Sequence, residues 1–200
     1  MHLEETLKHA TTLENIALRC IYSEYYFTMT TDHDGEFWPI VQNSLGESVC
    51  ILWAHVFGNR SDDLHYSNFF NRDNVKSIGN KYTAESIKER ILLKIDMNEA
   101  EYKLFWQEVK ECRDMYVAHK QISATSIIFP YIDKCRIMME EIRNILEELM
   151  NHWNESNPNI DEIMNFVEYY AWNKNKYLLS KSSKAFEKDI KSIALNITNK

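Results

Sequence analysis

The chain has 200 residues, of which 44% are hydrophobic and 26% charged, enough for one domain with a hydrophobic core. Its 4 glycines and 3 prolines are too few for the tight turns of a many-stranded β-fold. The net charge of −7 argues against an extended nucleic-acid-binding surface, because such surfaces are basic, and no Lys/Arg cluster is visible before the C-terminal tail. Any nucleic-acid role is therefore expected to depend on a small local site.

Apolar residues recur at helical spacing along most of the chain, which predicts an all-α fold. Pro39 fits the first turn of one helix and Gly58 the end of the same helix. Asn98 followed by Glu101 is typical of a helix N-terminus. The expected helices cover residues 3–29, 36–57, 83–95, 98–119, 130–153 and 160–179.

Residues 59–80 interrupt this pattern, since they are rich in Asn, Asp and Ser but also carry Tyr66, Phe69 and Phe70. A connection of this length is either functional or packed down through its aromatic residues. We expect a bundle of four or five core helices over residues 1–155, and a C-terminal helical extension over 156–200 packed on the same domain. The lysines of the extension favour a solvated helix face over an RNA contact.

The N-terminus is polar and acidic, without the basic region and apolar run of a secretory signal. No apolar stretch approaches the ~20 residues that cross a bilayer. The four cysteines contain no C-x-x-C pair and are expected to be buried, reduced thiols: Cys20, Cys50, Cys112 and Cys135. These features predict a cytoplasmic protein with no membrane partner.

Two histidines, His55 and His65, flank a loop that contains Asp62 and Asp63. Together they could be imagined as metal ligands, but their spacing fits no known site, so packed loop histidines are the favoured interpretation. No other set of residues resembles a Mg²⁺ or Zn²⁺ site, and no cofactor motif is present. We expect neither a metal nor a cofactor.

The tryptophans Trp38, Trp53 and Trp106 favour core or dimer-interface positions over a base-stacking surface. Cys112 lies on the apolar stripe of its expected helix and has no positioned base near it in sequence, which argues against a thiol enzyme.

The candidate chemical site is Arg113, Asp114 and His119, at the end of the helix expected over 98–119. Arg offers a permanent forked cation for phosphate oxygens, and His transfers protons near neutral pH. Cleavage of a phosphodiester by the adjacent ribose 2′-hydroxyl needs these two roles. The structural alternative is a helix-terminal ion pair and a histidine that bonds the last carbonyls of its helix.

Six positions on an ideal helix advance the direction of a side chain by about 600°, so Arg113 and His119 are about 120° apart. For both to reach one phosphate, either the last turn must loosen at His119, or two copies of the chain must bring their motifs together.

The segment RDMYVAH resembles the R-x(4–6)-H signature of the HEPN superfamily (higher eukaryotes and prokaryotes nucleotide-binding), with five residues between Arg and His. The wider pattern resembles a bacterial branch linked to phage abortive infection. In that branch a W/C-x-x-x-FG segment precedes an R-D/N-K-x-x-AH helix. The matching stretches here are CILWAHVFG, SDDLHYSNFF and FWQEVKECRDMYVAH, and the resemblance covers roughly residues 1–150.

The resemblance implies a HEPN-like helical bundle and a homodimer in which two motifs face each other, with the apolar stripe of the helix ending at His119 in the interface. It also implies a metal-independent endoribonuclease that acts on RNA in toxin–antitoxin or phage-defence systems, with an antitoxin protein as a further partner. Arg113 would hold the scissile phosphate, and His119 would act as general base or acid.

Asp114 stands where the active ribonucleases more often have Asn. An acid there either adds negative charge beside the phosphate site or fixes the orientation of Arg113. The alternative function is a non-catalytic HEPN-like module that binds a partner protein or nucleotide.

Overall fold

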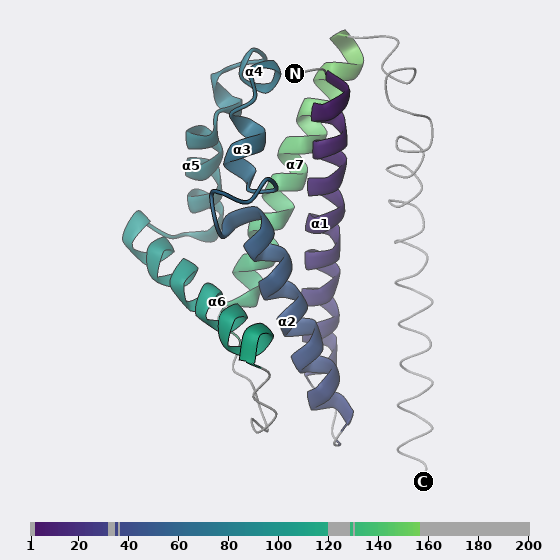
Figure 1. The fold of residues 1–200 in the computed structure, drawn as a ribbon, viewed down its shortest axis with the longest axis vertical. Coiled ribbons are helices and arrows are strands. Elements are labelled where there is room, and N and C mark those ends of the chain that lie inside the picture. The colour runs from purple at the N-terminus through teal and green to yellow at the C-terminus, as the bar shows by residue number, and fades with distance from the viewer. Residues whose placement is uncertain (1–2, 32–34, 36, 120–128, 130, 157–200) are drawn as a thin grey trace. The chain divides into compact units, whose positions relative to one another are not determined.

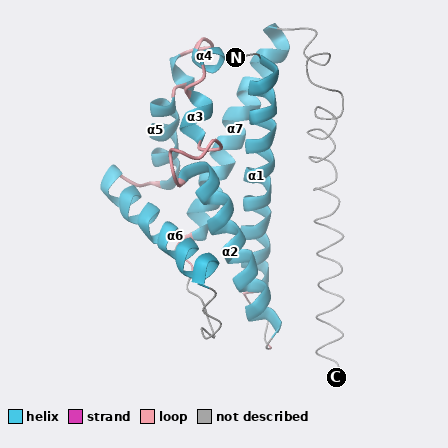
Figure 2. Ribbon diagram, viewed as in Figure 1, coloured by secondary structure: helices cyan, strands magenta, loops and turns pink. Residues whose placement is uncertain are grey.

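The computed structural model describes residues 3–31, 35, 37–119, 129 and 131–156, with only the backbone described for 115–119. Over these ranges Figure 2 shows helices and loops and no strand, which confirms the all-α fold. The elements are α1 (Leu3–Thr30), α2 (Phe37–Phe57), α3 (Tyr66–Phe70), α4 (Asp73–Lys76), a 3-10 turn η1 (Asn80–Tyr82), α5 (Ala84–Ile95), α6 (Glu99–His119) and α7 (Ile132–Ser156).

The long helices pack into a bundle (Figure 1). α1 packs against both α2 and α7, and α2 also contacts α7. α5 lies on α7, whereas α6 packs on α2 and runs obliquely to α1 and α7. The largest fully buried side chains include Trp53, Phe57, Phe69 and Phe105, which come from α2, α3 and α6. None of the helices in the described ranges combines the length and apolarity that a membrane span requires.

Local sequence signals set the helix ends that matter for the site. The carboxylate of Glu101 accepts the backbone N–H of Asn98 (2.8 Å), and the Asn98 side chain accepts the N–H of Glu101 (3.1 Å), so the expected cap of α6 is present. α2 stops at Gly58, whose N–H donates to Ala54 O (2.9 Å). A Cβ at Gly58 would collide with the Ala54 carbonyl oxygen, so a side chain there would disturb this stop.

The connection over residues 59–80 is not an open loop. It contains α3, α4 and the start of η1, and three of its residues, Phe69, Phe70 and Val75, are fully buried. Of the two expectations for this segment, packing through its aromatic residues is therefore confirmed. Its first residues, next to the end of α2, remain exposed.

Residues Met1–Ser156 form one compact unit. The helix expected over 160–179 and the lysine-rich tail lie outside the described residues. The extension expected over 156–200 is likewise undescribed beyond Ser156, the last residue of α7.

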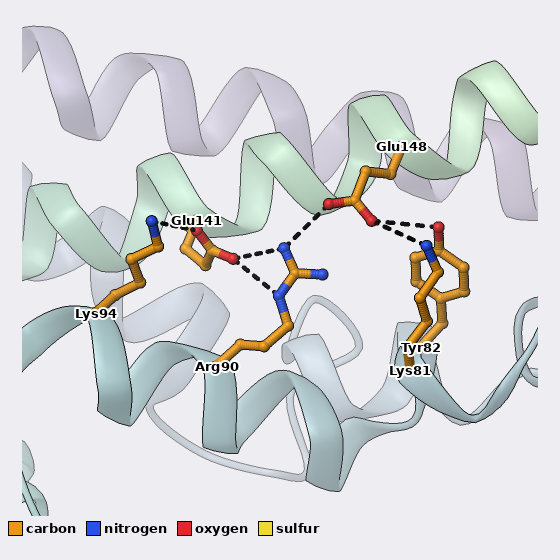
Figure 3. A network of polar contacts seen from close by, with 6 residues as sticks. All are labelled: Lys81, Tyr82, Arg90, Lys94, Glu141 and Glu148. Atoms are coloured by element: carbon orange, nitrogen blue, oxygen red, sulfur yellow. Dashed lines mark hydrogen bonds and ion pairs between the residues drawn. The ribbon is translucent and has the colours of Figure 1, made fainter.

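A polar network joins α5 to α7 (Figure 3). Arg90 donates from Nε (3.0 Å) and Nη2 (2.7 Å) to the nearly buried carboxylate of Glu141, and from Nη2 to Glu148 (3.1 Å). The same two carboxylates are contacted by Lys81, Tyr82 and Lys94. Arg90 is therefore the main cation that compensates the buried charge of Glu141.

We expect Arg90→Ala to lower the free energy of unfolding by about 2 kcal/mol, measured by urea denaturation. The effect is below the ~3–5 kcal/mol of a broken, fully buried pair because the Arg90 side chain is 32% exposed. Lys81→Gln is the matched control, since Lys81 is 66% exposed and the loss of its surface ion pair with Glu148 should leave the free energy of unfolding nearly unchanged. Equal losses in the two variants would contradict this account of the network.

Candidate functional site

A groove of about 1060 Å³ opens beside α6. Its walls come from the end of α2 with the loop after it, the start of α3, α5, and the first four turns of α6. Of the described residues that line it, one is acidic, Glu99, and the cationic ones are Arg60, Lys88, Lys103, Lys110 and Arg113. The aromatic ones are Phe57, Tyr66, Tyr102 and Trp106. We call this feature the basic groove.

One face of α6 carries most of the positive charge of the basic groove. Lys103, Trp106, Lys110 and Arg113 follow each other at intervals of three, four and three residues, which places them on one side of a helix. From Lys103 to Arg113 this row extends about 15 Å along the axis. It forms a line of cations in a chain whose net charge is −7.

The neighbouring face of α6 explains why this row points outward. Phe105, Val109 and Cys112 are buried, and the Phe105 ring meets Trp53 of α2 edge to face, with 5.5 Å between ring centres. Burying a side chain such as that of Phe105 stabilises the packed helix by about 1.5–3 kcal/mol. These residues were expected at a dimer interface, but they are already buried within one chain and are not available for that role.

Trp106 lies in the middle of the cation row. Its indole Nε1–H donates to the backbone oxygen of Phe57 (2.7 Å), and the ammonium of Lys110 lies over the ring, 5.1 Å from its centre. The tryptophan is partly buried and lines the groove, so it does not lie in the core, and the dimer interface, the other position expected for it, stays a prediction. The core position is confirmed for Trp38 and Trp53, which are 5% and 0% exposed.

Arg113 lines the basic groove at the end of the row. Its Nε–H and one Nη2–H donate to the same carboxylate oxygen of Asp114, at 2.8 and 2.6 Å. This contact holds the guanidinium in one orientation and leaves its other three N–H groups for a ligand. The Arg113 side chain is 28% exposed, so it is accessible from solvent.

His119 is the last residue of α6, and its side chain lies outside the described part of the structure. The helix continues through this residue, so within one chain positions 113 and 119 are about 9 Å apart along the axis and about 120° apart around it. Of the two routes to convergence considered above, this geometry favours the one that uses a second copy of the chain.

His65, which also lines the groove, has a structural role. It caps α3: its Nδ1 accepts the backbone N–H of Ser67 (3.2 Å) and lies 2.8 Å from the Ser67 hydroxyl. Burial, and then the positive charge of Arg60, lower the pKa of His65 to about 4. The ring is therefore neutral at neutral pH, as the cap requires.

His55 is on the surface, with Nδ1 3.5 Å from a carboxylate oxygen of Asp62. Within the described ranges no three His, Cys, Asp or Glu side chains are grouped so that they could hold a metal ion. His55 and His65 thus have separate partners.

All four cysteines are buried free thiols, as expected. Cys112 of α6 lies 3.8 Å from Cys50 of α2, sulfur to sulfur, inside the α2–α6 contact. Burial also holds the pKa of Cys20 and Cys135 far above the usual value of a thiol. The buried thiols are packing residues of the core.

The sequence interpretation missed the basic groove. It recognised Arg113 but found no cation cluster before the tail, because Arg60 and Lys88 lie on other segments and become neighbours of α6 only in the fold. One signal was available: Lys103, Lys110 and Arg113 recur at helical spacing, on a face next to the apolar stripe.

Comparison with protein-family models, with curated proteins and with solved structures finds no match to this chain.

Proposed function

We propose that this protein is a HEPN-like, metal-independent endoribonuclease that binds RNA in the basic groove and cleaves it at Arg113 and His119. The observation that carries the proposal is the position of Arg113, the motif arginine, at the end of a row of cations that lines an open groove in an otherwise acidic chain. Local positive charge beside a partly exposed aromatic side chain, as Trp106 provides here, is what a small RNA site requires.

The proposed reaction needs no group beyond the motif, the RNA and solvent water. His119 accepts the proton of a ribose 2′-hydroxyl, the 2′-oxygen attacks the adjacent phosphorus, and the bond from phosphorus to the 5′-oxygen breaks. That oxygen takes up a proton from solvent water, His119 returns its own proton to solvent, and the products are a 2′,3′-cyclic phosphate and a 5′-hydroxyl. Arg113, oriented by Asp114, stabilises the negative charge that develops on the phosphorane.

We propose a homodimer as the active unit, because a continuous α6 separates the two motif positions around the helix within one chain. A two-fold axis near the end of α6 would place His119 of one subunit beside Arg113 of the other. Action in the cytoplasm as a toxin or phage-defence effector, restrained by an antitoxin protein, completes the proposal.

One observation favours a second candidate, the non-catalytic module. Asp114 stands where the active ribonucleases more often have Asn, and its carboxylate partly neutralises Arg113 at 2.6 Å. A module of this kind would bind a nucleotide or a partner protein in the groove without cleaving RNA.

The deciding experiment incubates the purified chain with end-labelled single-stranded RNA and with DNA of the same sequence, each with and without EDTA. We expect cleavage of RNA alone, because DNA lacks the 2′-hydroxyl nucleophile. EDTA should leave the rate unchanged, and the products should carry cyclic phosphate ends. Light scattering on the same sample should report a dimer. A folded chain that cleaves no RNA would overturn the proposal in favour of the module.

A further inference from the structure

Trp106 is an anchored aromatic platform in the basic groove. The hydrogen bond from its Nε1 to Phe57 O (2.7 Å) ties the ring to the end of α2, so the ring is held in place before any ligand arrives. Base–aromatic stacking on a fixed ring avoids the entropy of ordering a mobile side chain. The buried face of α6, packed on α2, holds the backbone that carries this ring.

Cations lie on both sides of Trp106 along α6. Lys103 is one turn before it and Lys110 one turn after it, at about 4.5 and 6 Å along the axis, and Arg113 is a further 4.5 Å beyond Lys110. The Lys110 ammonium rests over the indole, 5.1 Å from its centre. A flexible lysine in this position can turn to a phosphate while a base takes its place over the ring.

A different segment of the chain adds a further positive charge to the groove. Arg60, in the loop after α2, is exposed and lines the same groove as Lys103. At the α5 side the charge of Lys88 is already paired with Glu99, at 2.7 Å, so this end is close to neutral. The positive charge is thus concentrated around Trp106 and toward Arg113.

These features distinguish the kind of nucleic acid. In a duplex the bases are paired and stacked on each other, so none can reach an indole inside a groove, whereas the bases of a single strand can turn outward. The groove volume of about 1060 Å³ is at the upper limit of small-ligand pockets, and the row of cations extends about 15 Å. A single-stranded segment of several nucleotides fits both features better than one nucleotide does.

We propose that Trp106, with Lys103, Lys110 and Arg60, forms a subsite that stacks an unpaired RNA base and holds its flanking phosphates, next to the phosphate that Arg113 contacts. This proposal rests on the proposed function, because it takes RNA as the ligand of the groove. The subsite makes the protein bind single-stranded RNA in preference to duplex RNA, whether or not the RNA is then cleaved.

The test measures the binding of a fluorescent single-stranded RNA of about ten nucleotides by anisotropy, using the full chain with His119→Ala so that no RNA is cleaved. Trp106→Leu is expected to bind about 5- to 150-fold more weakly, the effect of losing one base–aromatic stack. Trp106→Phe should bind more tightly than Trp106→Leu but more weakly than the parent protein, because phenylalanine keeps a ring face and loses the Nε1 hydrogen bond that anchors the ring to Phe57.

Lys110→Gln should weaken binding and reduce the slope of log K against log salt concentration by about 0.7, the value for one phosphate contact on a single strand. Lys76→Gln is the matched control, since Lys76 is exposed on α4 and does not line the groove. A duplex RNA should bind more weakly than the single strand. An acidic peptide of equal charge should compete poorly.

Three outcomes would overturn the subsite: unchanged binding in Trp106→Leu, equal losses in Trp106→Leu and Trp106→Phe, or equal competition by the acidic peptide. These three outcomes can be distinguished from results that refute the proposed nuclease function. A wild-type chain that binds single-stranded RNA through Trp106 but never cleaves it refutes the nuclease and keeps the subsite. A chain that cleaves RNA while Trp106→Leu changes neither binding nor KM refutes the subsite alone.

Discussion

His119→Ala is expected to reduce RNA cleavage by about 10²–10⁴-fold, the contribution of general acid–base catalysis. Arg113→Ala should reduce it by about 10²–10³-fold, because the phosphorane loses one preorganised donor. Arg113→Lys should recover only part of this loss, since an ammonium cannot bind Asp114 and a phosphate with the geometry of a guanidinium. The measurement is the single-turnover rate of cleavage of a labelled RNA.

Both alanine variants should unfold within a few degrees of wild type, because residues near a helix end rarely hold a core together. Asp114→Asn separates the two roles considered for Asp114. It keeps an oxygen that can accept from Arg113 and removes one negative charge, so RNA affinity should rise while cleavage persists. A His119→Ala protein that unfolds or loses its dimer, together with a wild type that cleaves no RNA, would show that the motif is structural.

The free energy of unfolding is expected to fall as the pH drops from about 7 to 4, by about 3 kcal/mol from His65 alone. The pKa of this buried, capping ring is lowered from 6.5 to about 4. Between these values the unfolded chain binds the proton and the folded chain does not, so acid favours unfolding. The contribution of His65 to the free energy of unfolding is therefore complete above pH 6.5 and is lost as the pH falls toward 4. About 2 kcal/mol should be lost by pH 5.

His9 contributes in the same direction, because burial and then the charge of Arg72 lower its pKa to about 4. The test compares urea denaturation at several pH values for wild type and His65→Asn. Asparagine can still cap α3 but does not titrate, so His65→Asn should reduce the pH dependence to the part that His9 contributes. A His65→Asn protein with the slope of wild type would contradict the assignment.

The helices and their ends could be predicted from the sequence because the forces that set them act over a few residues. Asn98 and Glu101 satisfy each other's backbone N–H groups within one turn, and Gly58 ends α2 by a bond to a residue four positions earlier. The apolar spacing of Phe105, Val109 and Cys112 indicated one buried face of α6 in the same way. The pair of Arg113 with Asp114 is also local, since the two residues are adjacent.

The basic groove could not be read in this way. Arg60 and Lys88 come close to the α6 cations only because Phe105 and Cys112 pack α6 onto α2, which turns the face carrying Lys103, Lys110 and Arg113 toward the loop after α2. Periodicity shows that a helix has a buried face and an exposed one, but not which distant segments will border the exposed face. Trp106 shows the same limit. A tryptophan is usually expected in the core, and only the packing of α6 on α2 placed this one at the basic groove.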